Sequence, residues 1–205
     1  MHAIVRPTAA ALLSMALAAG CGSGGDQRVE PKPVDLTAAP AALTWENYRG
    51  VRLPRSAVDG PTQFGQIANG YTQTPQGAVL AAIRGQAALI LAGDNEWGTV
   101  VATLTAPGPG RDEFAANRAV LSVSGSVPAG QAPRFVGFKV ITYQPDPPIA
   151  GVRVVEQIGS PPRTFAYPVA LQWIGDWRIV LPTVAEGIDA IELDNLDGYT
   201  RLEDK

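Results

Sequence analysis

The apolar residues of this chain change their spacing once, near Pro133. From Thr74 to Leu121 they recur at steps of three and four residues, as on one face of an α-helix. From Phe135 to Leu181 they alternate with other residues, as in β-strands. Helices followed by antiparallel strands are typical of α+β domains, in which the helices pack on one face of the sheet. The order of these segments predicts one α+β domain over residues 45–185.

The helical part has a clear start. The hydroxyl of Thr74 can cap a helix, and Pro75 fits the first turn. Gly93 suits its end. The expected apolar stripe consists of Val79, Ala82, Ile83, Ala87 and Ile90. A run of Pro and Gly separates two shorter expected helices, at residues 94–104 and 111–121.

Four strands are expected in the second part of the chain. They cover residues 135–143, 149–158, 163–174 and 176–181, with turns rich in Pro or Gly between them. Gly175-Asp176 favours a tight hairpin that brings Trp173 and Trp177 together. The strands would therefore form a four-stranded antiparallel meander.

The N-terminal segment carries a targeting signal. Arg6 precedes an apolar run that ends in Leu17-Ala18-Ala19-Gly20-Cys21, and this order resembles a bacterial lipoprotein signal. The run has about a dozen residues, whereas a membrane-spanning helix needs about 20. We expect residues 1–20 to be cleaved and Cys21 to be lipidated, which would anchor the chain on the extracytoplasmic face of the cell membrane. A conventional secretory signal that contains a cysteine is the alternative.

Cleavage would restrict the chemistry of the mature chain. The sequence has one His and one Cys. His2 would be removed with the signal and the thiol of Cys21 would be acylated, so Ser-His-Asp or Cys-His catalysis and His or Cys metal sites are excluded. We therefore expect a protein that is not an enzyme and has no metal and no cofactor.

Two flanking segments differ in composition from the expected domain. Residues 21–44 are rich in Pro, Ala and Gly, and predict a disordered linker behind the lipid anchor. Residues 186–205 contain many more acidic than basic side chains, and predict an acidic C-terminal tail. Such a tail repels nucleic acid, which we exclude as a partner, or it serves only solubility.

Three local stretches are distinctive: residues 51–54 with 59–61, residues 70–82, and the hairpin 171–180. Together they resemble an uncharacterised domain family of actinobacteria, their conjugative elements and their phages. The excess of Arg over Lys agrees with a GC-rich genome. The expected layout, N-terminal helices packed on a curved four-stranded antiparallel sheet, is similar to the NTF2-like or cystatin-like cone. The resemblance implies a mobile-element or cell-envelope context and supplies no catalytic residues.

Cone-shaped domains of this kind often hold a pocket between the first helix and the sheet. The resemblance therefore makes the aromatic residues candidates for pocket walls, or else for core packing. They are Tyr71, Trp97, Tyr143, Tyr167, Trp173 and Trp177.

These observations favour a non-enzymatic envelope lipoprotein that acts through protein contacts. Its partners would be the membrane, through the N-terminal lipid, and an envelope protein, as in a conjugation or secretion system or in prophage-encoded superinfection exclusion. The alternative is a lipoprotein that binds a small apolar ligand between helix and sheet.

Overall fold

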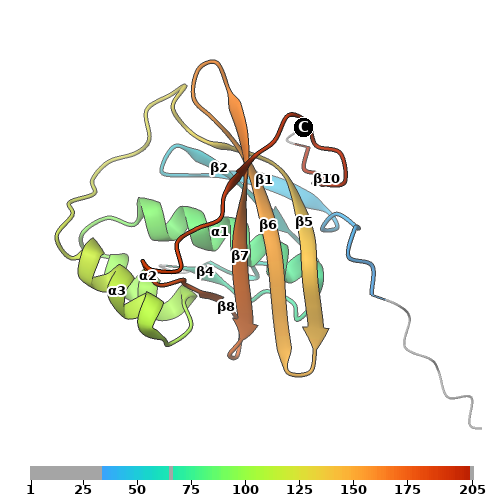
Figure 1. The fold of residues 1–205 in the computed structure, drawn as a ribbon, viewed down its shortest axis with the longest axis horizontal. Coiled ribbons are helices and arrows are strands. Elements are labelled where there is room, and N and C mark those ends of the chain that lie inside the picture. Colours follow the sequence, from blue (N-terminus) through green and yellow to red (C-terminus); the bar gives the residue numbers. More distant parts are fainter. Residues whose placement is uncertain (1–33, 65–66, 204–205) are drawn as a thin grey trace, which may run out of the picture. The chain divides into compact units, whose positions relative to one another are not determined.

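The computed structural model describes residues 34–64 and 67–203 (Figure 1). The expected signal peptide, Cys21 and the first part of the expected linker lie outside the described residues.

The three helices lie close to their expected positions. They are α1 (Pro75–Leu91), α2 (Trp97–Leu104) and α3 (Pro109–Arg118). At the start of α1 the hydroxyl of Thr74 accepts a hydrogen bond from the N–H of Gly77 at 3.0 Å, so the predicted cap is confirmed.

The main sheet is antiparallel and has six strands. They are β5 (Arg134–Pro145), β6 (Pro148–Ile158), β7 (Arg163–Trp173), β8 (Trp177–Val180), β9 (Ile191–Glu192) and β10 (Thr200–Arg201). The strand order is β10-β5-β6-β7-β8, and β9 pairs with β7. On β7, β8 pairs with residues 170–173 and β9 with residues 165–166. Pro168, which has no N–H to donate, lies between these two pairings.

Two hairpins precede the helices. The first joins β1 (Leu43–Tyr48) to β2 (Val51–Ser56), and the second joins β3 (Gln63–Phe64) to β4 (Ala68–Asn69). The sequence showed no regular period over residues 45–70, because each strand here is short and tied to buried neighbours elsewhere in the chain.

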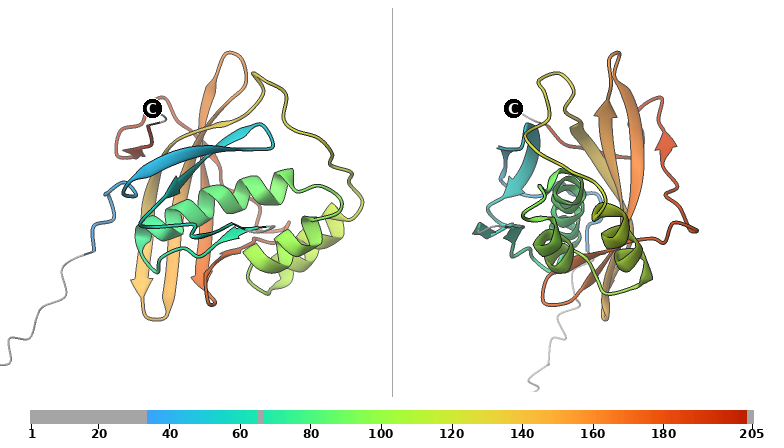
Figure 2. Two further views of the ribbon diagram at one scale, coloured as in Figure 1. Left: turned by 180° about the vertical axis from the view of Figure 1, so that it is seen from behind. Right: turned by 90° about the vertical axis from the view of Figure 1, so that its left-hand side faces the viewer.

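Helix α1 lies between the main sheet and the β1–β2 hairpin (Figure 2). It is therefore buried on two sides, which explains why its sequence is apolar nearly all round. Its small residues permit this close packing. A Cβ added at Gly85 would lie 2.6 Å from Cδ1 of Ile179 on β8. The core between helix and sheets includes Leu53, Val79, Ile83, Phe138, Val152 and Leu171.

The C-terminal segment covers part of the other face of the sheet. It pairs with β7 through β9 and with β5 through β10, and it runs across the sheet on the side away from α1 (Figures 1 and 2). Val155 and Ala166 are neighbours in register and are both fully buried, although they lie outside the core around α1. Residues expected to form an acidic tail thus contain two strands of the sheet.

The predicted fold class was wrong. We expected N-terminal helices packed on a curved four-stranded antiparallel sheet, in an NTF2-like or cystatin-like cone. The structure is mostly β, with three short helices, a six-stranded antiparallel sheet and two small sheets. The cause is non-local pairing, because β9 and β10 have two residues each and leave no periodic signal in the sequence.

Candidate binding groove

An apolar groove lies between α1, α3, strands β7 and β8, and the segment 181–190 that connects β8 to β9. We call residues 181–190 the strap. The groove has a volume of about 700 Å³. Its apolar lining consists of Leu89, Ile90, Phe114, Leu121, Val169, Ile179, Val180, Leu181, Val184 and Ile188.

Several of these side chains are strongly exposed. The exposed fraction is 69% for Ile90, 60% for Leu121, 73% for Val184 and 66% for Ile188. Single exposed apolar residues are common on protein surfaces, but a group of them around one groove is typical of an interaction site. The four residues come from α1, from the end of the α3 region and from the strap, and only the tertiary fold brings them to one place.

Specific contacts hold the strap against α3. The N–H of Val184 donates a hydrogen bond to Oε2 of Glu113 at 2.7 Å. A Cβ at Gly110 would lie 2.0 Å from the carbonyl oxygen of Leu181, so only glycine permits this approach. Within the strap, the N–H and hydroxyl of Thr183 donate to Oε2 of Glu186, and these hydrogen bonds lower the pKa of that carboxyl. The strap is therefore a wall of defined shape.

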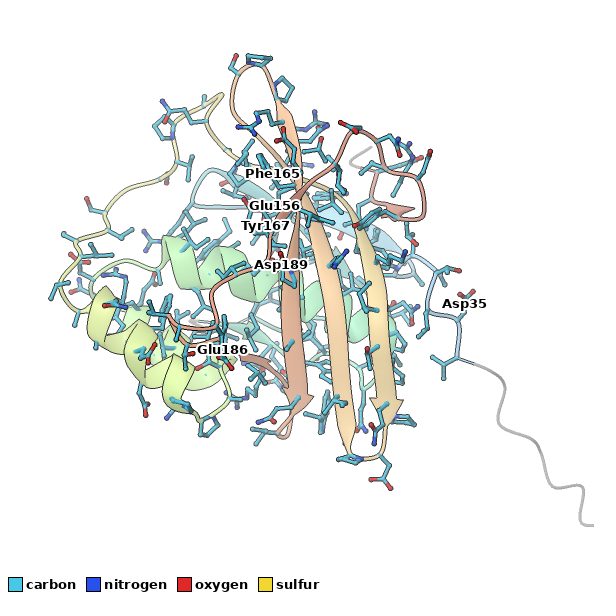
Figure 3. The ribbon with its side chains drawn as sticks, viewed as in Figure 1. Asp35, Glu156, Phe165, Tyr167, Glu186 and Asp189 are labelled. Atoms are coloured by element: carbon cyan, nitrogen blue, oxygen red, sulfur yellow. The ribbon has the colours of Figure 1, made fainter. Side chains whose placement is uncertain are left out.

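The charged groups around the groove are mainly acidic. Glu113, Glu186 and Asp189 line it, and Figure 3 shows Glu186 near α3 and Asp189 close to β7. Arg118 also lines it, but its guanidinium already contacts Asp94 at 3.2 Å and the carbonyl oxygen of Leu121 at 2.7 Å. Because the basic group is neutralised locally, the rim favours a cationic partner.

Three of the six aromatic residues proposed from the sequence lie together at the β7–β8 hairpin. The rings of Trp173 and Trp177 are 5.4 Å apart in a T-shaped arrangement, and the ring of Tyr143 is 6.3 Å from that of Trp177. Hydrogen bonds tie this cluster to the segment before α1. The indole N–H of Trp177 donates to the carbonyl oxygen of Thr72 at 2.8 Å, and Tyr143 donates to that of Gln73 at 2.9 Å.

The other three lie elsewhere. Tyr71 is buried beside Arg84 and lines a separate, smaller cavity, and burial raises the pKa of its hydroxyl. Trp97 stacks under the guanidinium of Arg118, with 5.5 Å between Cζ and the ring centre. Tyr167 packs near Phe165 on β7, with 6.3 Å between the rings (Figure 3). None of the six lines the groove.

The groove was not expected from the sequence, for two reasons. Ile90 was expected in the apolar stripe of α1, although this side chain is exposed and lines the groove. Residues 186–190 of the strap were expected to belong to the acidic C-terminal tail. The apolar residues Val184 and Ile188, spaced by four within an acidic segment, are the signal that could have revealed a contact surface.

Neither a membrane span nor a metal cluster is found in the part of the chain that the structure describes. No helix within residues 34–64 and 67–203 has the length and apolar character to cross a membrane. Within the same residues, no three His, Cys, Asp or Glu side chains are grouped so that they could hold a metal ion.

A family model described as "Domain of unknown function (DUF8175)" matches residues 7–201. No curated protein and no solved structure matches the chain.

Proposed function

The chain belongs to the DUF8175 family, and from that starting point we propose that it is a membrane-anchored envelope lipoprotein that acts by binding another protein. Lipidation of Cys21 would hold the folded domain at the extracytoplasmic face of the membrane. The groove between α3 and the strap is the observation that carries the proposal, because several apolar side chains are clustered and exposed there on the surface of a folded domain.

The occupant we propose is an amphipathic segment of an envelope protein with basic residues beside its apolar face. The apolar side chains of Ile90, Leu121 and Ile188 would contact the apolar face of such a segment. Glu186 and Asp189 at the rim would attract its basic residues. The partner would be part of a conjugation or secretion machine, or a component that a prophage product blocks against superinfecting phage.

The size of the groove also favours a second candidate function, the binding of a small apolar ligand. Pockets for small molecules have volumes of about 300–1,000 Å³, and the groove, at about 700 Å³, falls in this range. A ligand of this class would not require the acidic rim, so the two functions differ in how they depend on Glu186 and Asp189.

Site-specific photocrosslinking in cells tests the proposal. A photoreactive amino acid at Ile188, in the groove, is compared with one at Ile141, which is 50% exposed on β5 and does not line it. We expect a discrete protein adduct at position 188 only, and its loss when Leu121→Glu is added. Adducts with lipid alone would support the small-ligand function, and equal protein adducts at both positions would contradict a groove-specific partner.

Charge reversal then separates the two functions. Asp189→Lys should weaken the crosslink to a basic partner several-fold and leave the uptake of an apolar dye unchanged, because no hydrogen bond of the strap depends on this side chain among the described residues. Asp146→Lys, in the β5–β6 turn, is the matched control on an exposed site away from the groove. Conjugation frequency and phage plating efficiency with the wild type and with Leu121→Glu identify the process in which the partner acts.

A further inference from the structure

A second cavity lies on the other side of α1, between this helix, α2 and the two N-terminal hairpins. Its volume is about 140 Å³, and it shares no lining residue with the groove. Apolar walls come from Leu53, Phe64, Ile67, Ala68, Ala88, Val100 and Leu104. Polar groups come from Glu46, Tyr48, Tyr71 and Arg84.

We propose that this cavity binds a small monocarboxylate with a compact apolar body, whose carboxylate contacts the guanidinium of Arg84.

Arg84 lies on α1, and its guanidinium makes fewer hydrogen bonds than its N–H groups allow. Its residue is 6% exposed, its Nη1 donates to the carbonyl oxygen of Pro54 at 3.3 Å, and its Nη2 is paired with Glu46. The Nε atom is buried and has no hydrogen-bond partner among the described residues. The single contact of each Nη leaves a further N–H group on both of these atoms, and a ligand carboxylate in the cavity would accept hydrogen bonds from them.

The charged side chains beside the cavity have a net positive charge that one anion would balance. Glu46 faces Arg84 and also lies 3.8 Å from Arg55, so two guanidinium groups share one carboxylate. This cluster carries one net positive charge, which a monocarboxylate would neutralise. Arg55 also lies over the ring of Phe64, with 5.1 Å between Cζ and the ring centre, and Phe64 is one of the walls.

Tyr71 supplies a second polar group to the same cavity. Its hydroxyl is protonated at neutral pH, as is usual for tyrosine, and it lies beside the guanidinium of Arg84, where it can donate a hydrogen bond to a ligand. A neutral donor beside a cation suits a carboxylate oxygen better than it suits a second cation.

The volume limits the body of the ligand to about one ring or a short branched chain. A dry cavity of about 150 Å³ in another protein binds benzene. The walls formed by Leu53, Val100 and Leu104 are apolar and would contact such a body. Benzoate and isovalerate therefore represent the ligand class.

Isothermal titration calorimetry of the full chain with benzoate, isovalerate and the neutral analogue benzamide tests the proposal. We expect at least one of the two acids to bind and benzamide to bind at least tenfold more weakly. Ala88→Phe, which fills the cavity from α1, should abolish binding. Ala102→Phe, on an exposed site of α2 that does not line the cavity, is the matched control and should bind normally.

Two arginine variants test the role of charge. Arg84→Met should remove the preference for benzoate over benzamide, and Arg55→Met, on a more exposed side chain, should weaken benzoate binding about threefold or more while the domain stays folded. Leu121→Glu in the groove should change nothing, which separates this site from the proposed protein interface. Equal binding of benzoate and benzamide, no binding by either acid, or acid binding that survives Ala88→Phe would overturn the proposal.

Discussion

Gly110 at the start of α3 lies directly against Leu181 at the start of the strap. A Cβ at position 110 would be 2.0 Å from the carbonyl oxygen of Leu181 and 2.7 Å from its carbonyl carbon. Backbone atoms cannot move away as a flexible side chain can. The contact therefore fixes one wall of the groove relative to α3, and its geometry depends on the absence of a single methyl group.

Gly110→Ala is expected to lower the free energy of unfolding by about 1–3 kcal/mol, as overpacking usually does. The variant should also lose groove binding, because the strap must move. Gly98→Ala on α2 is the matched control, since a Cβ there would meet nothing within 4 Å. That change should raise the free energy of unfolding by about 0.5–1 kcal/mol through helix propensity. Urea unfolding measures both, and equal stabilities of the two variants would contradict the close contact.

Trp177→Phe should destabilise the domain more than Trp173→Phe. Trp177 is 2% exposed and donates its indole N–H to Thr72, so the change leaves a partly buried carbonyl oxygen without its donor. We expect a loss of about 2 kcal/mol, from the hydrogen bond and the lost ring volume. Trp173 is half-buried, and its replacement should cost about 1 kcal/mol or less. Thermal and urea unfolding of the two variants provide the comparison, and the reverse order would refute the anchoring role of Trp177.

Asp94 is expected to stabilise the folded state only above acidic pH. Hydrogen bonds from the Ser122 hydroxyl, the Val123 N–H and the Arg118 guanidinium lower the pKa of Asp94 from 3.8 to about 2. A lowered pKa in the folded state means that the contribution is present above about pH 4 and is lost as the pH falls through about 2.

Asp94→Asn should therefore be less stable than the wild type at pH 7, and the difference should shrink between pH 4 and pH 2. Urea unfolding at pH 7, 4 and 2 measures this convergence. Asp112→Asn on α3, where the replaced side chain is exposed, is the control. Its free energy of unfolding should differ from that of the wild type by the same amount at all three pH values. A difference for Asp94→Asn that stays constant down to pH 2 would show that the charge of Asp94 is not involved.

Glu156 on β6 is expected to lower the stability of the folded state as the pH rises, which is the opposite of the effect of Asp94. Burial raises the pKa of its carboxyl from 4.5 to about 7, and no hydrogen bond offsets this burial among the described residues. The folded state then binds more protons than the unfolded state between pH 4.5 and 7, so stability falls as the pH rises through this range.

Glu156→Gln should remove this pH dependence. It should match the wild type near pH 4 and exceed its free energy of unfolding by about 3 kcal/mol at pH 8. NMR titration of the Glu156 carboxyl provides an independent readout, with a midpoint near pH 7 expected. A midpoint below pH 5 would mean that the carboxyl is solvated in the folded protein.

The local structure of the helical part followed from the sequence because its signals are local. Thr74 and Pro75 marked the start of α1, and the hydroxyl of Thr74 makes the expected cap. The hairpin at Gly175 also appears, with a positive φ at this glycine and Trp173 paired with Trp177. In both cases a few adjacent residues supply the energy that selects the conformation, so no distant contact was needed for the prediction.

The sheet and the groove were decided by the tertiary structure. Strands β9 and β10 form because the C-terminal segment pairs with β7 and β5 at a distance in sequence. The groove forms because Gly110 admits Leu181 and so brings the strap beside α3. Two-residue strands and a single close backbone contact have no periodicity. The sequence by itself determined where the helices and the long strands lie, and only long-range burial decided how many strands pair and which apolar side chains stay exposed.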